Sequence, residues 1–235
     1  MSPAKRFVKS GMSRINKSVF NGFFEMDDGK KSRFFTKNFV PGVSVYGEKL
    51  FKENNTEYRE FAPQSSKLAA ALRLDLKYFE LKDSSLVLYL GSSTGTTVSH
   101  ISDILIKGMV FGVDSAPVVM RELVFLAEQR KNIAPVLADA SQPDQYKDLI
   151  VSVDFLYQDV AQKNQVDIFL KNLQFLKKGC LAFLVIKARS IDFSKKPEDV
   201  FSAVSEELKK HVSVLQEINI SSFQKDHCMF ICRKR

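Results

Sequence analysis

The segment from Leu86 to Thr97 constrains the fold more than any other part of the chain. It reads Leu-Val-Leu-Tyr-Leu-Gly-Ser-Ser-Thr-Gly-Thr-Thr, which is an apolar run, a loop with two glycines and the start of a helical pattern. A strand, a glycine loop and a helix in this order present free backbone N–H groups where α/β sheets bind nucleotide-like ligands. Gly91 and Gly95 have the spacing G-x-x-x-G, which is neither the dinucleotide fingerprint nor a P-loop. The segment therefore predicts an α/β sheet with a ligand site at the end of this strand.

From Leu86 onward, strand and helix patterns alternate. The expected strands are short apolar runs at Leu86–Leu90, Met109–Val113, Ala134–Ala138, Val153–Tyr157, Leu181–Ile186, Val212–Ile220 and His227–Cys232. The expected helices begin near Thr96, Pro117, Gln142, Asn164 and Pro197. Ser65 or Ser66 can cap one more helix before the first of these strands. Nearly continuous apolar strands that alternate with helices indicate a mostly parallel sheet of seven strands with helices on both faces.

Residues 1–55 have a different pattern. Two runs rich in aromatic residues flank a turn at Asp27–Lys30 and predict a β-hairpin, and Val40–Tyr46 continues as strand or loop. A module of this size is too small to be stable without packing on another part of the chain. We therefore expect a small β-rich N-terminal domain at residues 1–55 and an α/β domain at residues 56–235.

The chain carries a formal net charge of +8, and its isoelectric point is about 9.3. A basic surface favours a polyanionic partner, of which nucleic acid is the commonest. Ordinary solubility charge is the alternative interpretation. Basic residues concentrate at Lys5–Lys37 and at Arg233–Arg235, which favours the polyanionic partner.

No apolar run reaches the ~18 residues of a membrane-spanning helix, and the N-terminus lacks the apolar region of a signal peptide. We therefore expect a cytoplasmic protein with no membrane contact. Cys180, Cys228 and Cys232 fit a reducing compartment as small core hydrophobes, because a metal site needs more ligands at closer spacing. No metal site is predicted. His100 and His211 fall within helical patterns and are expected to be structural or surface residues.

Polar or glycine residues follow five successive predicted strands. These strand ends are Gly91, Asp114, Asp139, Asp159 and Lys187. Taken singly, each acid is more often a helix cap, and the lysine is more often a solvated end of an apolar run. Ligands of open α/β sheets bind at the carboxyl ends of the strands, where Asp114 suits the two hydroxyls of a ribose. Together, the five strand ends favour a site for a nucleoside-like ligand.

Several segments carry a resemblance that covers nearly the whole chain. They are Asn38–Glu48, Tyr58–Glu60, Ser66–Ala71, Tyr89–Asp103, Arg130–Val136, Asp159–Gln162, Ile186–Ala188 and Asp226–His227. In these segments the sequence resembles the fibrillarins, which are S-adenosylmethionine-dependent RNA 2′-O-methyltransferases of box C/D ribonucleoproteins. Because no glycine- and arginine-rich tail is present, it is more similar to the archaeal form than to the nucleolar one.

The resemblance implies a Rossmann-like class I methyltransferase fold that uses S-adenosylmethionine. The implied cofactor site consists of Gly91, Thr96, Thr97, Asp114, Ser115, Asp139, Ala140, Asp159 and Gln162. The implied catalytic group consists of Lys67, Asp159, Lys187 and His227. The sequence departs from the family pattern at Asp114-Ser115, where Glu-Phe is usual, and at Lys225, where an arginine is usual.

Methyl transfer to a ribose 2′-hydroxyl requires alignment of the oxygen with the methyl donor and removal of the hydroxyl proton. We expect Lys187 to accept this proton, with burial and the neighbouring cation Lys67 favouring its neutral amine. Asp159 would orient Lys187 and the methionine end of the cofactor, while Lys67 and His227 would position the nucleotide. The alternative is that both lysines stabilise the developing oxyanion and the proton leaves to water.

The resemblance also implies partners: a box C/D guide RNA, substrate rRNA or tRNA, a Nop-domain scaffold protein and a kink-turn-binding ribosomal-type protein. The location would be nucleolar only in a eukaryotic source. Two other functions stay open. A methyltransferase for protein or small molecules would share the cofactor residues but would leave Lys67, Lys187 and His227 unexplained. A structural subunit with weak or no catalysis is compatible with Asp114-Ser115, although the intact catalytic group argues against it.

Overall fold

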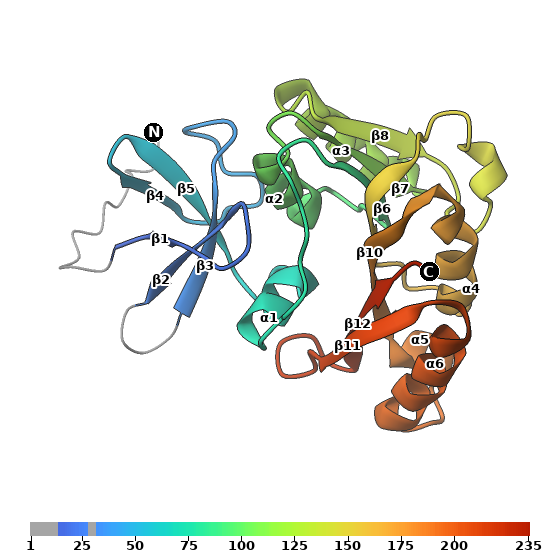
Figure 1. Cartoon of the computed structure of the whole chain (residues 1–235). Helices are drawn as coiled ribbons and strands as arrows, with labels where there is room; N and C mark the ends of the chain where they lie inside the picture. Colours follow the sequence, from blue (N-terminus) through green and yellow to red (C-terminus); the bar gives the residue numbers. More distant parts are fainter. Residues whose placement is uncertain (1–13, 28–31) are drawn as a thin grey trace.

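Two β-sheets lie side by side in the computed structural model, which describes residues 14–27 and 32–235 (Figure 1). The strands of the first sheet are β1 (Asn16–Lys17), β2 (Phe23–Asp27), β3 (Ser32–Lys37), β4 (Leu50–Glu53) and β5 (Thr56–Phe61). This sheet is antiparallel, in the order β1-β2-β3-β5-β4. The predicted hairpin is the pair β2–β3, in which Phe24 is the register partner of Phe35. Most of its predicted turn Asp27–Lys30, namely residues 28–30, lies outside the described residues.

The first sheet continues beyond the expected domain boundary at residue 55. Strand β5 pairs with β3, with Phe61 opposite Phe34 in register, so the sheet ends at Phe61. A division at residue 55 would separate strands that share a hydrogen-bonded ladder. This pairing joins segments that are far apart in the sequence, so the local pattern around Thr56 does not reveal it. The segment Val40–Tyr46, expected as strand or loop, is a loop.

The second sheet confirms the predicted architecture. Its strands are β6 (Leu86–Leu90), β7 (Met109–Asp114), β8 (Ile133–Leu137), β9 (Val153–Gln158), β10 (Leu176–Lys187), β11 (Ser213–Asn219) and β12 (His227–Arg233). Their order is β11-β12-β10-β9-β6-β7-β8. The five strands from β10 to β8 are parallel, and β12 runs antiparallel to both β10 and β11.

The helices are α1 (Lys67–Arg73), α2 (Thr96–Ile104), α3 (Pro117–Gln129), α4 (Gln165–Asn172), α5 (Ala188–Ile191) and α6 (Pro197–His211), with short 3-10 turns η1 (Pro143–Gln145) and η2 (Leu173–Phe175). Ser66 caps α1, and its hydroxyl accepts a hydrogen bond from the amide of Ala69. The helices predicted near Thr96, Pro117, Asn164 and Pro197 all form, each within one residue of its expected start.

Two elements differ from the expected ones. The helix expected near Gln142 is only the 3-10 turn η1, because side chains close this segment locally: the Asp139 carboxylate accepts the amide of Ser141 at 2.8 Å, and Gln145 donates to Gln142 at 2.8 Å. Strand β10 begins at Leu176 rather than Leu181, since Gly179, with φ of +79°, permits a register shift before the regular pairing with β9.

The second sheet is covered on both faces, as its apolar strands require. Alternate strand residues enter two separate cores: Val87 and Tyr89 pack with α1, α2 and α3, whereas Leu88 and Leu90 pack with α4 and α6. In Figure 1, α2 lies between the two sheets, and α4, α5 and α6 lie together on the other side of the second sheet. The first sheet therefore packs against the helical face that contains α2.

The three cysteines are unpaired thiols, and burial raises the pKa of Cys228 and Cys232 to about 12, so both stay protonated as core residues. Across residues 14–27 and 32–235, no group of three or more His, Cys, Asp or Glu side chains is arranged to hold a metal ion. In the same part of the chain, no helix has the length and apolar character needed to cross a membrane. The basic segment Lys5–Lys37 lies partly outside the described residues.

The basic C-terminal triplet contributes to the fold. Arg233 forms an ion pair with Glu80 at 2.7 Å. The Lys234 ammonium donates to the backbone carbonyls of Leu173 and Leu176 at 2.7 and 2.6 Å. Charges that are engaged in this way are less available to an external polyanion than the sequence suggests.

Candidate active site

The loop after β6 lies at the point where the strand order reverses, since β6 pairs with both β7 and β9. Gly91 has φ of +78°, and a Cβ at this position would lie 2.3 Å from the carbonyl oxygen of Asp159. Its N–H donates to the Val113 carbonyl at 2.9 Å. Only glycine allows this close approach between the ends of two strands. The predicted ligand loop therefore lies at the switch point of the sheet, where open α/β folds bind ligands.

Helix α2 begins directly after this loop, with Gly95 as its N-cap at φ of +93°. No side chain caps the helix, so the amides of its first turn, from Thr96 and Thr97, point out of the helix N-terminus without an intrahelical partner. The Thr97 side chain is nearly buried and lies 2.9 Å from the Ser66 hydroxyl of α1. The start of α2 is thereby tied to the start of the helix that carries Lys67.

Asp114 ends β7 and orders the loop on its neighbouring strand. One carboxylate oxygen accepts the amide of Ser93 at 2.9 Å, and the other accepts the amide of Ala116 at 3.0 Å. Each oxygen has a further lone pair, so the carboxylate can still accept bonds from a ligand. Ser115, which follows it, is exposed.

Asp139 and Ala140 follow β8. The amide of Ser141 lowers the pKa of the Asp139 carboxyl below its usual value, with burial opposing this and the side chains of Ser141 and Gln142 adding to it. Ala140 is buried, and its carbonyl accepts a hydrogen bond from Asn172 at 2.9 Å. Gln162 lies exposed in the loop after β9. The predicted cofactor residues thus line the ends of β6, β7, β8 and β9.

Lys67 and Asp159 form an ion pair across the same edge of the sheet. The Lys67 Nζ and Asp159 Oδ2 atoms are 2.8 Å apart, and the side chains are 23 and 22% exposed. The two residues are 92 positions apart in the sequence. Capping by Ser66 places Lys67 at the first position of α1, and Asp159 is the first residue after β9. The pair is open enough for a ligand to reach either partner.

Lys187 and His227 face each other as register partners of the antiparallel strands β10 and β12. The His227 Nδ1 atom lies 2.6 Å from the Lys225 carbonyl; because a carbonyl only accepts, we assign the ring proton to Nδ1, which leaves Nε2 as an acceptor. Burial lowers the pKa of His227 despite the Lys225 carbonyl, and the charges of Lys67 and Lys187 add to this, with Asp159 opposing them. The structure therefore brings the four predicted catalytic residues within electrostatic reach of one another.

The family model of fibrillarin matches residues 15–235, nearly the whole described chain. This chain belongs to the fibrillarin family. It is 43% identical over 226 residues to the fibrillarin-like rRNA/tRNA 2′-O-methyltransferase of Pyrococcus abyssi, covering 95% of this chain and 100% of that protein.

Three solved fibrillarins have the same fold. The Methanococcus jannaschii pre-rRNA processing protein superposes with a TM-score of 0.90 at 43% identity, over 95% of this chain and 99% of that one. The Aeropyrum pernix fibrillarin, solved with natively bound S-adenosyl-L-methionine, gives 0.85 at 38%, over 93 and 97%. A fibrillarin in complex with Nop5p gives 0.80 at 36%, over 86 and 94%.

Two buried glutamines that the sequence analysis did not single out hold the backbone near Lys187. Gln165, at the start of α4, holds the backbone of Lys187: it accepts the Lys187 amide at 2.9 Å and donates to the Lys187 carbonyl at 3.3 Å. Gln158, at the end of β9, donates to the Gln165 carbonyl at 2.7 Å. Both are buried glutamines at strand or helix ends, and the only sequence signal is a polar residue next to an apolar run.

Proposed function

We propose that this chain is an S-adenosylmethionine-dependent RNA ribose 2′-O-methyltransferase of a box C/D ribonucleoprotein. The observation that carries the proposal is the 2.8 Å pair of Lys67 and Asp159, with Lys187 and His227 beside it, at the ligand-binding edge of a fibrillarin fold. A methyltransferase for proteins or small molecules would share the cofactor residues but would leave Lys67, Lys187 and His227 unexplained. The group of two lysines, a carboxylate and an imidazole suits a polyanionic acceptor whose hydroxyl must lose a proton.

S-adenosylmethionine, when bound, supplies an electrophilic sulfonium methyl group. The chain offers a fitting cradle: a Cβ at Gly91 would meet the Asp159 carbonyl, so only a bare backbone lies there. Among the described residues, the buried oxygens Ser92 Oγ and Gln158 Oε1, adjacent to this loop and to Asp159, have no hydrogen-bond partner. The residues proposed to hold the cofactor are Gly91, Thr96, Thr97, Asp114, Ser115, Asp139, Ala140, Asp159 and Gln162.

The proposed role of each catalytic residue follows from where it lies in the site. Asp159 holds Lys67 and lies next to the cofactor loop, so it orients both. His227 offers Nε2 to the nucleotide. Lys187 is exposed, rather than buried as we expected for a proton acceptor. The nucleotide itself would have to cover Lys187 and exclude water before the neutral amine is favoured; stabilisation of the oxyanion by both lysines is the alternative role.

The named relatives support some of the proposed partners, and the others are proposed from the family resemblance. The complex of a related fibrillarin with Nop5p supports a Nop-domain scaffold partner for this chain. The name of the Pyrococcus abyssi relative supports rRNA and tRNA as substrates. A box C/D guide RNA and a kink-turn-binding ribosomal-type protein complete the proposed particle. A cytoplasmic location stays a prediction.

The test is methyl transfer from radiolabelled S-adenosylmethionine to a guide-paired RNA in the reconstituted particle. A matched substrate carries a 2′-deoxy sugar at the target nucleotide. Label that requires the 2′-hydroxyl is the expected result. Label on protein, or label that persists on the deoxy substrate, would contradict ribose methylation. Cofactor binding without any label would instead point to a different acceptor or a missing partner, and the absence of cofactor binding would favour the structural subunit.

A further inference from the structure

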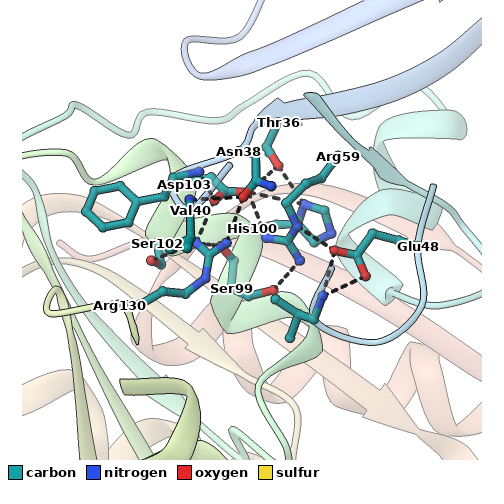
Figure 2. A network of polar contacts seen from close by, with 12 residues as sticks. Thr36, Asn38, Val40, Glu48, Arg59, Ser99, His100, Ser102, Asp103 and Arg130 are labelled. Carbon is teal, nitrogen blue, oxygen red and sulfur yellow. Dashed lines mark hydrogen bonds and ion pairs between the residues drawn. The ribbon is translucent and has the colours of Figure 1, made fainter. Parts of the chain in front are cut away.

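Helix α2 contains a set of buried polar side chains (Figure 2), most of which bond to the N-terminal domain, whereas Ser102 bonds to Asn132 and Arg130. Ser99, His100, Ser102 and Asp103 are all buried. Burying polar groups costs free energy unless each one finds a hydrogen-bond partner. The partners of these four residues therefore determine where the helix can sit.

Asp103 is the centre of this network. It accepts hydrogen bonds from two residues of the first sheet, the Arg59 guanidinium at 2.8 Å and the Thr36 hydroxyl at 2.6 Å. It also accepts the Arg130 guanidinium, at the end of α3, at 2.6 Å and the Phe39 amide at 2.9 Å. The carboxylate thereby joins both domains, with charge-assisted hydrogen bonds on both oxygens.

Arg59 is fully buried and uses each of its nitrogens. Nε donates to Glu48 at 2.5 Å, one terminal nitrogen donates to Asp103, and the other donates to Ser99 of α2 at 2.9 Å. Burial alone would raise the pKa of Glu48, but Arg59 and two backbone amides lower it overall, so this carboxylate stays charged. Two guanidinium groups and two carboxylates thus balance inside the interface, which removes most of the cost of burying each charge.

His100 completes the hydrogen bonds as a neutral ring. Burial lowers its pKa well below the usual value, and the charges of Arg59 and Arg130 add to this. The single Thr36 proton goes to Asp103, so Thr36 accepts from His100 Nδ1 at 2.7 Å, and the Tyr46 hydroxyl donates to Nε2 at 2.8 Å. The Tyr46 hydroxyl also lies 3.3 Å from the Glu60 carbonyl, a second and longer acceptor for the same proton. Thr36, His100 and Asp103 each have one consistent role, which favours a single arrangement of the interface.

The other end of α2 carries Thr96 and Thr97 at the proposed cofactor site. The helix is nine residues long, and every residue from Thr97 to Ile104 is buried. A short helix packed in this way moves as a unit, so a displacement at Asp103 also displaces the cofactor end. The contact of Thr97 with Ser66 passes the same displacement to Lys67, the next residue.

We infer that the first sheet positions the cofactor end of α2 through this network, and that Thr36, Arg59 and Asp103 are positioning residues for methyl transfer. The identity of the bound group rests on the proposed function. The network itself stands on the geometry of the described residues. A misplacement of about 1 Å at a reacting group can cost up to ~10²-fold in rate, so the small sheet has a role in catalysis as well as in stability.

The test compares three variants of the full chain. Thr36→Val removes the hydroxyl but keeps the shape, and it leaves the His100 N–H without an acceptor. Thr36→Ser keeps the hydroxyl. Ser205→Ala removes a partly buried hydrogen bond to Glu217 between α6 and β11, at the far edge of the second sheet, and serves as the stability control. Calorimetry measures binding of S-adenosylhomocysteine, and hydrogen exchange by mass spectrometry follows peptides covering residues 91–104.

Thr36→Val removes two buried hydrogen bonds, one to Asp103 and one from His100. We expect the dissociation constant of S-adenosylhomocysteine to rise between about threefold and tenfold, the equivalent of about one net hydrogen bond, because only part of the loss reaches the cofactor end of α2. Exchange in residues 91–104 should become faster. Thr36→Ser should restore both values, and Ser205→Ala should change neither. Unchanged binding and exchange in folded Thr36→Val would overturn the inference, as would equal effects in Ser205→Ala.

Two possible failures of this experiment have a planned response. If Thr36→Val does not fold, Tyr46→Phe, which removes the bond to His100 Nε2 and a longer bond to the Glu60 carbonyl, is judged by the same criteria. If the unmodified chain binds no S-adenosylhomocysteine, the proposed cofactor is wrong. The exchange of residues 91–104 then still decides whether the first sheet controls α2.

Discussion

At the scale of single residues, Lys187 is the position on which the proposed chemistry depends. It ends β10 opposite His227, and Gln165 fixes its backbone on both the amide and the carbonyl. Its side chain is exposed in the free protein. Across residues 14–27 and 32–235 it forms no ion pair, whereas Lys67 is held by Asp159. Of the two lysines, Lys187 is therefore the one free to meet a hydroxyl proton.

Lys187→Arg keeps the positive charge but prevents deprotonation. If Lys187 is the proton acceptor, single-turnover methyl transfer in the reconstituted particle should fall by about 10²–10⁴-fold, the usual contribution of a general base. Cofactor binding should stay unchanged. Full activity of the variant would instead assign Lys187 to stabilisation of the oxyanion.

His227 gives a prediction for the pH dependence of stability. Its pKa in the folded protein lies below the usual 6.5, first because of burial. As the pH falls below 6.5, the unfolded chain takes up a proton that folded His227 resists, so the free energy of unfolding should decrease. Urea denaturation of His227→Gln should show a weaker decrease between pH 6.5 and the lowered value. Some dependence should persist, because His100 is also held neutral; identical slopes in both proteins would contradict the assignment.

At the scale of elements, the loop after β6 decides where a ligand can bind. The glycines at its two ends have different tasks. Gly91 brings the backbones of β6 and β9 together, and Gly95 caps α2 with its positive φ while Leu123 and Leu126 of α3 pack on the position where a Cβ would be. The loop is thus fixed from both flanks before any ligand is present.

Two glycine substitutions distinguish the cost of a positive φ from the cost of a steric clash with the Asp159 carbonyl. Gly91 and Gly179 have nearly equal φ values, +78° and +79°, but only Gly91 has atoms where a Cβ would go. Gly179→Ala should lower the free energy of unfolding by about 1–2 kcal/mol, the cost of a left-handed residue. Gly91→Ala should cost more and should also weaken S-adenosylmethionine binding. Chemical denaturation and calorimetry measure the two effects; equal losses in both variants would show that the approach to Asp159 is unimportant.

At the scale of the whole molecule, buried charges join the two sheets. The centre of their interface is polar, with Arg59 and Asp103 fully or nearly buried. Around it pack rings from both domains, such as Phe61, whose centroid lies 4.2 Å from that of His100. Balanced buried charges tolerate removal of one partner poorly, because the other partner loses its compensation.

Arg59→Leu should therefore lower the free energy of unfolding by about 3–5 kcal/mol, since Glu48 and Asp103 lose their shared partner. We expect a single unfolding transition for both sheets, monitored by circular dichroism and tyrosine fluorescence. Lys107→Met, which removes an exposed pair with Asp83, is the control and should change stability little. Separate transitions of the two sheets in the unmodified chain would show that the interface does not couple them.

The sequence by itself determined the elements that depend on local pattern. Apolar runs and helical periodicity predicted the strands of the second sheet and its helices α2, α3, α4 and α6, but neither the short helix α5 nor the 3-10 turn η2, and they wrongly predicted a helix at Gln142. The residues at the strand ends predicted the cofactor edge. These features follow from neighbours in the chain, because side-chain alternation and capping are local. Gly91 and Asp114 are therefore identifiable as candidate ligand-binding residues from their neighbours in the sequence.

Tertiary structure alone decided the contacts between distant segments. Only the fold brings Lys67 to Asp159, pairs β5 with β3 across the expected boundary, and leaves Lys187 exposed. The Arg59–Asp103 network was hidden for the same reason: a charged residue in a strand pattern indicates a solvated face, and only the packing of the first sheet on α2 makes it buried. Burial and pairing at this distance depend on the whole arrangement of layers, which no local window of sequence contains.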